Sequence, residues 1–179
     1  DAGKFYQIAE EIDSIPVFFA EDELDIPGPL TGIYSSINAA SHEFCAIVAC
    51  DMVFANPKLI LHQGMKLLED EVDLVIPVND LGYTEPFHSF LLRSKCLPAM
   101  LRTINEGKIK PIDYFDKIKV AKQSIEESIL PSPASLFFVN INNVEALRKY
   151  EKITLENDSD YIYDVGAQPF AGSLTKIFD

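Results

Sequence analysis

The chain has 179 residues and a formal net charge of −13, from 15 basic and 28 acidic side chains. This length fits one domain of roughly 100–200 residues, or one domain with a tail, and is enough to bury a core. The acidic balance disfavours partners such as nucleic acid or an anionic membrane surface, because Lys and Arg drive binding to both. A hydrophobic content of 47% with 24% charged residues excludes a disordered chain, and no apolar run is long enough to span a bilayer.

The first half of the chain alternates expected helices with expected strands. Apolar spacing predicts a helix over residues 4–13, a strand over 15–19, a polar loop over 21–28 and a helix over 30–40. Residues 44–50 form a continuous apolar run. Because the run does not alternate, it indicates a strand that is buried on both faces, as in a parallel sheet.

The same alternation continues in the second half. The expected helices there cover residues 57–70, 97–106 and 143–150, and the expected strands cover 74–78, 86–92, 116–121 and 136–139. Strands that alternate with helices predict an α/β domain with a mostly parallel sheet. We place this domain at residues 1–150 and expect 151–179 to be a C-terminal tail packed on it, because the helical pattern stops near Tyr150.

The cysteines favour a reducing compartment. Cys45, Cys50 and Cys96 form no CxxC pair, so a cytoplasmic location is expected. None of the three has a neighbour in the sequence that would activate it as a nucleophile.

Asp51 is the leading candidate for a metal ligand. It directly follows the apolar run of residues 44–50, and ligands of open α/β sheets bind at the carboxyl ends of strands. Mg²⁺ prefers carboxylate and phosphate oxygens. A role for Asp51 in capping the following turn is an equally weighted alternative.

A second candidate is the loop that runs from Asp22 to Gly32, which contains two glycines and two prolines and leads into a helix. Glycine lets a ligand approach the backbone closely, and a helix N-terminus offers free N–H groups to an anion. The alternative is a tight connection that carries acidic surface residues.

His88 lies beside aromatic residues in the segment 85–90. It is a candidate contact for a substrate. A buried structural histidine is the favoured alternative, because a single His among aromatic side chains more often has that role.

Polar side chains late in the chain complete the set. Asn140 and Asn142 are suited to hydrogen bonds with a polar ring, whereas Asn143 is suited to capping the next helix. Lys108 and Lys110 follow a helix stop and are candidate contacts for a phosphate or carboxylate. Solvated lysines are the more common explanation for such a pair.

Taken in order, these motifs resemble the molybdenum cofactor guanylyltransferase family, also called molybdopterin-guanine dinucleotide biosynthesis protein A. Over residues 1–150, the resemblance rests on the PGPLTGI loop at 27–33, the strand end at 49–52, EPFH at 85–88, LLRS at 91–94, CLPA at 96–99 and the ending at 140–147. Other nucleotidyltransferases share single motifs, and the ordered set is more specific.

The resemblance implies a Rossmann-like nucleotidyltransferase with a three-layer αβα fold. It implies transfer of GMP from GTP to the molybdopterin cofactor, with release of pyrophosphate and with Mg²⁺ as the metal. By similarity, Asp51 would bind the metal and act in catalysis, and Asp22 and Gly32 would contact the nucleotide, with Glu21 as the alternative to Asp22. The residues implied for the acceptor are Asn140, Asn142, Lys110 and His88. Besides the substrates, the resemblance implies molybdoenzyme-maturation proteins as partners that bind transiently.

Two features depart from the family pattern. Relatives usually carry Arg where this chain has Lys110, and Lys keeps the charge but loses the bidentate geometry. The family begins with a strand and a glycine-rich LAGGxSxRxGxxK loop that holds the triphosphate, and the first residues here do not match it. The chain opens with Asp1 rather than Met, and its first residues are typical of the middle of a helix, so we expect that a segment upstream of Asp1 supplies this loop.

The expected reaction is direct displacement at the α-phosphorus of GTP by a phosphate oxygen of the cofactor. Charge neutralisation by the metal and positioning dominate such chemistry, so a Ser, Cys or His nucleophile is not required. Two alternatives stay open. One is a related transferase that uses CTP, or an NTP with a sugar phosphate as acceptor. The other is a non-catalytic nucleotide-binding module.

Overall fold

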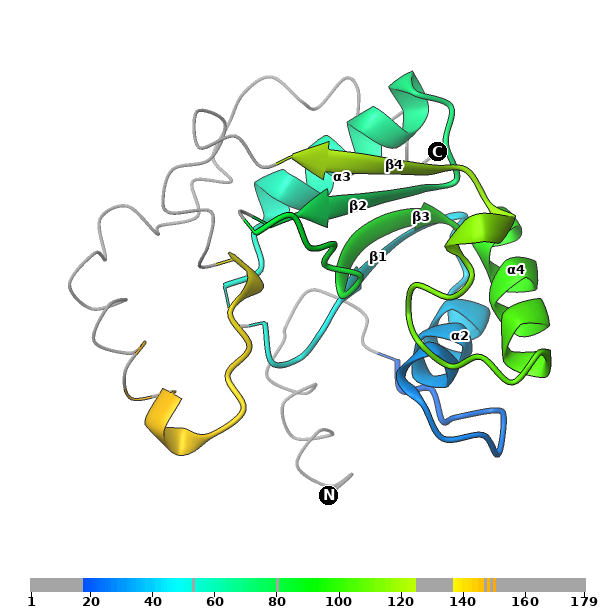
Figure 1. Cartoon of the computed structure of the whole chain (residues 1–179), viewed down its shortest axis with the longest axis horizontal. Helices are drawn as coiled ribbons and strands as arrows, with labels where there is room; N and C mark the ends of the chain where they lie inside the picture. Colours follow the sequence, from blue (N-terminus) through cyan, green and yellow to red (C-terminus); the bar gives the residue numbers. More distant parts are fainter. Residues whose placement is uncertain are drawn as a thin grey trace.

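The computed structural model describes residues 18–52, 54–79, 81–124, 137–146, 148 and 150 (Figure 1). Its strands are β1 (Phe44–Val48), β2 (Leu74–Val78), β3 (His88–Leu92) and β4 (Val120–Ser124). Its helices are α2 (Pro29–Ala39), α3 (Pro57–Glu69), α4 (Arg93–Asn105) and the short 3-10 helix η1 (Phe115–Lys117). The expected helix at 4–13 and the tail at 151–179 lie outside the described residues.

The four strands form one mixed sheet in the order β1-β3-β2-β4 (Figure 1). Strand β3 is antiparallel to both β1 and β2, and β2 is parallel to β4. The prediction of a mostly parallel sheet is therefore wrong for the described strands. The described residues of the link from Asn79 to Phe87 contain no helix, and the link is too short for the crossover that a parallel neighbour needs. Strand β3 therefore returns in the opposite direction and inserts between β1 and β2.

Helices cover both faces of this sheet. On one face, α2 and α4 pack against Cys45, Leu74 and Leu91. On the other face, Leu67 of α3 packs against Val75 and Phe90. The resulting order of helix, sheet and helix is the three-layer arrangement that the resemblance implied.

The strands expected at 44–50 and 136–139 differ from the structure. Strand β1 ends at Val48, which is 41% exposed, so it is not buried on both faces as predicted. In the described sheet it has one neighbour, β3. The strand expected at 136–139 is also wrong where the structure describes it, because Phe137 and Phe138 form a 3-10 turn. The backbone of these two residues does not pair with the sheet. Their side chains pack on Leu59 of α3 and His88 of β3.

The topology collects several chain segments at one edge of the sheet. Strands β1, β2 and β4 run in one direction, so their carboxyl ends share this edge with the first residue of β3. The segment 137–146, gold in Figure 1, begins beside the same edge. No helix in the described part of the chain is long and apolar enough to cross a membrane.

Candidate functional site

Asp51 lies in a turn directly after β1. The turn is anchored because Ala49 N donates to Phe87 O at 3.1 Å and Met52 N donates to Ala49 O at 3.1 Å. The Asp51 side chain is partly exposed. Within the described residues its carboxylate has no hydrogen-bond or ion-pair partner, so both oxygens are available to a ligand.

The structure brings Asn140 and Asn142 next to Asp51. Ile141 N donates to the backbone oxygen of Asp51 at 2.9 Å, and the two asparagines flank Ile141 with exposed side chains. Asn143 has the capping role that was expected for it, because its Oδ1 accepts from Ala146 N at 2.8 Å. Residues from two distant parts of the sequence, Asp51 and the segment 140–142, therefore lie side by side after the end of β1.

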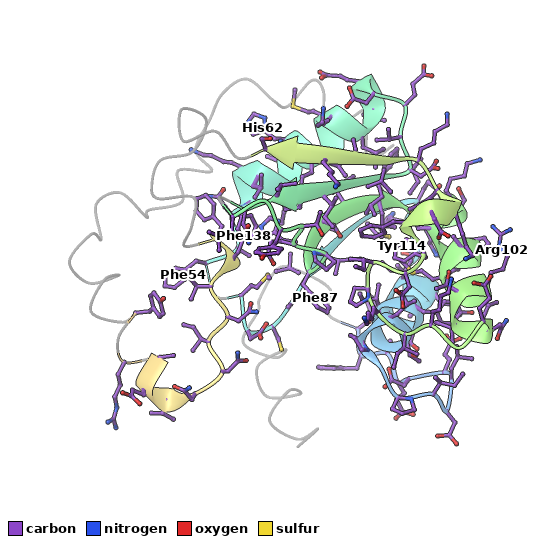
Figure 2. The ribbon with its side chains drawn as sticks, viewed as in Figure 1. Phe54, His62, Phe87, Arg102, Tyr114 and Phe138 are labelled. Atoms are coloured by element: carbon purple, nitrogen blue, oxygen red, sulfur yellow. The ribbon has the colours of Figure 1, made fainter. Side chains whose placement is uncertain are left out.

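Two aromatic contacts hold this late segment in place. The rings of Phe54 and Tyr150 meet edge to face, with centroids 5.6 Å apart. The ring of Phe138 meets that of His88 in the same way at 5.8 Å. Figure 2 shows Phe138 pointing from the gold segment toward the sheet edge, with Phe54 beside the same segment.

Asn79 and Glu85 are two polar residues at this edge that the sequence reasoning did not select. Asn79 Nδ2 donates to Glu85 Oε1 at 2.8 Å, and Asn79 Oδ1 accepts from the backbone N–H groups of Leu81 and Tyr83, both at 3.0 Å. Burial raises the pKa of the Glu85 carboxyl, and the bond from Asn79 opposes that rise. A sequence signal was available, because Asn79 directly follows the buried strand β2, just as Asp51 directly follows the apolar run of residues 44–50.

His88 is fully buried at the start of β3. Its Nε2 accepts from the backbone N–H of Asn56 at 3.3 Å, and its backbone oxygen accepts from Gln63 Nε2 at 2.8 Å. Burial lowers the pKa of the His88 imidazole, which favours the neutral ring. These surroundings are those of a buried structural histidine, the alternative that the sequence favoured for His88.

A second group of candidates lies at the start of α2. A Cβ placed on Gly32 would lie 3.8 Å from Asp22 Oδ1. Ile109 O accepts from Leu30 N at 3.1 Å, which puts the loop that carries Lys110 against the first turn of α2. No hydrogen bond or ion pair among the described residues joins this group to Asp51 or to the segment 140–142.

The N-terminus of α2 does not offer the free N–H groups that were expected there. Pro29 has no N–H, and Leu30 N donates to Ile109 O. Thr31 N and Gly32 N both donate to Gly28 O, at 3.2 and 3.4 Å. An anion at this end of α2 would therefore be bound by side chains.

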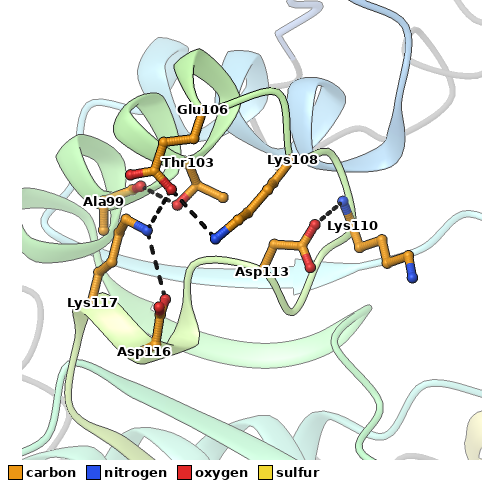
Figure 3. Close-up of polar contacts among 8 residues, drawn as sticks. All are labelled: Ala99, Thr103, Glu106, Lys108, Lys110, Asp113, Asp116 and Lys117. Carbon is orange, nitrogen blue, oxygen red and sulfur yellow. Dashed lines mark hydrogen bonds and ion pairs between the residues drawn. The ribbon is translucent and has the colours of Figure 1, made fainter.

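Lys108 and Lys110 differ in their neighbours (Figure 3). Lys108 Nζ lies 3.5 Å from Glu106 Oε2, which also pairs with Lys117 at 3.0 Å. Both ammonium groups hold the pKa of the Glu106 carboxyl below its usual range, and the hydrogen bond from Lys117 has the largest effect. The backbone N–H of Lys110 donates to Asp113 Oδ2 at 2.9 Å, and within the described chain its ammonium has no ion-pair partner. Of the two lysines, Lys110 is therefore the one whose ammonium is available to a ligand.

The buried cysteines are not suited to nucleophilic chemistry. Burial raises the pKa of the Cys96 thiol to about 12 and also raises the pKa of Cys45. Both therefore stay protonated near neutral pH. Cys50 is exposed.

The residues around Asp51 fit a magnesium ion that arrives together with a nucleotide. No group of three or more His, Cys, Asp or Glu side chains in the described residues could hold a metal by itself. Mg²⁺ is commonly bound through one or two carboxylates, with phosphate oxygens and water completing its shell. A single free carboxylate beside two exposed amides matches that chemistry.

Gly28→Ala and Gly32→Ala should have opposite effects on stability. At Gly28 a new Cβ would lie 2.8 Å from Ile109 Cβ, so the loop must shift and strain the bond from Leu30 N to Ile109 O. We expect a loss of about 1–3 kcal/mol. Gly32 lies inside α2 with room for a methyl group, so Ala there should add about 0.5–1 kcal/mol. Urea unfolding of both variants tests this, and equal shifts would contradict it.

Comparison with known proteins gives a consistent picture. The model of the MobA-like NTP transferase domain matches residues 2–117. A molybdenum cofactor guanylyltransferase of Desulfosudis oleivorans is 30% identical over 132 residues, which cover 74% of this chain and 64% of that protein. A probable molybdenum cofactor guanylyltransferase of Peptoclostridium acidaminophilum is 29% identical over 135 residues, which cover 72% and 60%. The chain thus matches somewhat less than two thirds of the length of these relatives.

Solved structures resemble the fold. The molybdopterin-guanine dinucleotide biosynthesis protein A of Archaeoglobus fulgidus superposes with a TM-score of 0.66 at 21% identity, covering 87% of this chain and 76% of that one. A putative protein of Aquifex aeolicus gives a TM-score of 0.60 at 15% identity, covering 80% and 68%.

Proposed function

Because the chain belongs to the family of MobA-like NTP transferase domains, we propose that it transfers GMP from GTP to the molybdopterin cofactor and releases pyrophosphate. The observation that carries the proposal is the free carboxylate of Asp51 at the end of β1, tied through Ile141 to a segment that presents Asn140 and Asn142. The names of the relatives at about 30% identity support the same reaction.

In this proposal the group at the start of α2 binds the nucleotide. The exposed carboxylate of Asp22 accepts hydrogen bonds from donors on the guanine base, and Gly32 leaves space beside it. The free ammonium of Lys110 contacts a phosphate as a point charge. Because the backbone N–H groups of this turn are already bonded, side chains must supply the recognition here.

The group around Asp51 binds the metal and the acceptor. Asp51 holds Mg²⁺, which when bound neutralises charge between two anionic reactants. The amides of Asn140 and Asn142 hydrogen-bond the polar ring of the acceptor and orient its phosphate. A bond then forms between that phosphate oxygen and the α-phosphorus of GTP, while the bond to pyrophosphate breaks. The protein contributes alignment and electrostatic stabilisation and forms no covalent intermediate.

Calorimetric titration of the full-length protein with GTP, CTP and ATP, each with and without Mg²⁺, tests the proposal. We expect selective binding of GTP that strengthens with Mg²⁺. Lys110→Ala should weaken GTP binding about tenfold, because it removes one charged hydrogen bond. Lys108→Ala is the matched control and should leave the affinity unchanged, since this ammonium pairs with Glu106.

Each other outcome has a definite meaning. A preference for CTP or ATP would overturn the choice of GTP and assign a sister transferase of the same family. Failure to bind any nucleotide would overturn the proposed transferase, whereas nucleotide binding without transfer activity would leave a non-catalytic nucleotide-binding module. Equal effects of the two lysine variants would contradict the role given to Lys110.

A further inference from the structure

The ring of His88 contacts both the loop 49–56, which contains Asp51, and the late segment that is bonded to the Asp51 backbone. One edge of the imidazole faces the loop 49–56, because Nε2 accepts from Asn56 N at 3.3 Å. The ring also meets Phe138 edge to face, with an interplanar angle of 84°. No part of His88 is exposed. Direct contact with a substrate is therefore not the role that its surroundings suggest.

The loop 49–56 is anchored at both ends on the beginning of β3. At its start, Ala49 N donates to Phe87 O at 3.1 Å, and at its end Asn56 N donates to His88 Nε2. Asp51 lies between these two anchors. The late segment is joined to the same loop through the bond from Ile141 N to Asp51 O.

Other groups do not replace the His88 acceptor. The Asn56 side chain caps α3, since its Oδ1 accepts from Lys58 N at 2.9 Å and from Leu59 N at 3.4 Å. It is therefore committed to the helix, and His88 Nε2 is the partner of the Asn56 backbone N–H in the described structure. This hydrogen bond is partly buried, and an N–H that loses its acceptor away from water is costly, so the loop would rearrange.

We propose that His88 is a positioning residue of the transferase site, which uses its Nε2 acceptor and its ring to hold the loop 49–56 and the segment 137–142 in the arrangement that aligns Asp51 with Asn140 and Asn142. The catalytic consequence rests on the proposed function. The anchoring itself does not, because it is a property of the folded chain.

The anchoring predicts a specific tautomer. A neutral imidazole that accepts at Nε2 carries its proton on Nδ1. Long-range ¹⁵N–¹H correlation spectra of the protein near neutral pH should therefore show His88 with Nδ1 protonated. A spectrum in which Nε2 carries the proton would overturn the proposal, because that nitrogen then has no lone pair for Asn56.

Two substitutions separate the acceptor from the ring. His88→Phe keeps an aromatic ring against Phe138 and removes the acceptor, whereas His88→Gln places an amide oxygen near the position of Nε2. In His88→Phe we expect the Asn56 amide to exchange with solvent about tenfold faster, and His88→Gln should restore most of the protection. His62→Gln, on α3 (Figure 2), is the matched control and should leave this exchange rate unchanged.

Loss of the His88 anchor should lower kcat and leave the KM for GTP nearly unchanged. Misplacement by about 1 Å can lower a rate about a hundredfold, so His88→Phe should lower kcat by about ten- to a hundredfold. It should also raise the Mg²⁺ concentration needed for half-maximal activity. The KM for GTP should change less than about twofold, because the proposed nucleotide contacts lie at the start of α2, and His88→Gln should recover kcat.

The outcomes distinguish this proposal from the proposed function. Unchanged kcat in His88→Phe, or no recovery in His88→Gln, would overturn the positioning role. If the wild-type protein has no transferase activity, the proposed function fails, and the tautomer and the Asn56 exchange rate decide the anchoring. If His88→Phe does not fold, the wild-type tautomer together with the Asn56 exchange rate of His88→Gln decides it.

Discussion

Asp51→Asn is expected to reduce Mg²⁺-dependent GMP transfer by about 10²–10³-fold, the effect of removing one preorganised charge at a reacting phosphate. The substitution keeps the size of the side chain and one of its oxygens. It also leaves the backbone bond from Ile141 N to Asp51 O intact. The loss should therefore appear in catalysis, with the fold unchanged.

Steady-state kinetics across a range of Mg²⁺ concentrations, together with urea unfolding, test this expectation. Asp70→Asn is a suitable control because Asp70 is an exposed carboxylate at the end of α3, paired with Lys66 at 2.6 Å. That pair contributes only about 0.3–0.5 kcal/mol, so transfer should be unaffected. Full Mg²⁺-dependent turnover in Asp51→Asn would show that the metal assignment is wrong.

Arg93→Met should destabilise the protein by about 2–4 kcal/mol, because it removes two hydrogen bonds from a charged donor. Arg93 begins α4, and its guanidinium reaches the end of α2. Its Nε donates to Ile37 O and its Nη2 donates to Asn38 O, both at 2.9 Å. These carbonyls belong to the last turn of α2, where the usual i+4 donors are missing and Ile37 O also accepts from Ala40 N at 3.3 Å. Met keeps most of the side-chain volume but leaves both oxygens without this donor.

Urea unfolding of Arg93→Met and Arg102→Met measures the difference. Arg102 lies on the same helix, is exposed, and makes a longer bond of 3.4 Å to Pro98 O, so its loss should change stability by less than about 0.5 kcal/mol. Arg93→Lys should fall between the wild type and Arg93→Met, since one ammonium cannot reproduce the paired geometry. Equal midpoints for the two methionine variants would contradict the bridging role of Arg93.

Local signals explain the elements that were predicted well. The helix expected at 57–70 is observed at Pro57–Glu69, and the strand expected at 74–78 is observed at Leu74–Val78. A proline in the first turn, apolar spacing along a helix and a short continuous apolar run all act within a few residues. Such features are readable without knowing what lies across the fold.

Strand β4 shows where local signals fail. It was expected at 116–121 and is observed at Val120–Ser124, after the 3-10 helix η1. Its position depends on its pairing with β2, in which Leu74 is opposite Val120 and Val78 is opposite Ser124. Register of this kind comes from the partner strand, which the local pattern of apolar residues does not contain.

The candidate site divides in the same way. Asp51 was selected because a carboxylate directly after a buried strand occupies a defined place in an α/β sheet. Its proximity to Asn140 and Asn142 depends on the backbone bond with Ile141, which only the folded chain reveals. The resemblance placed Lys110 with the acceptor, whereas the bond between Leu30 and Ile109 puts its loop at the start of α2.

The sequence alone therefore determined the order of most helices and strands, the family resemblance and the place of Asp51 after β1. The tertiary structure decided the direction of β3, the two separate groups of candidate residues and the burial of His88. The physical reason is the range of the interactions. Helix propensity, proline and apolar periodicity act between neighbours in the chain, whereas strand pairing, burial and the partners of backbone N–H groups depend on segments far apart in sequence.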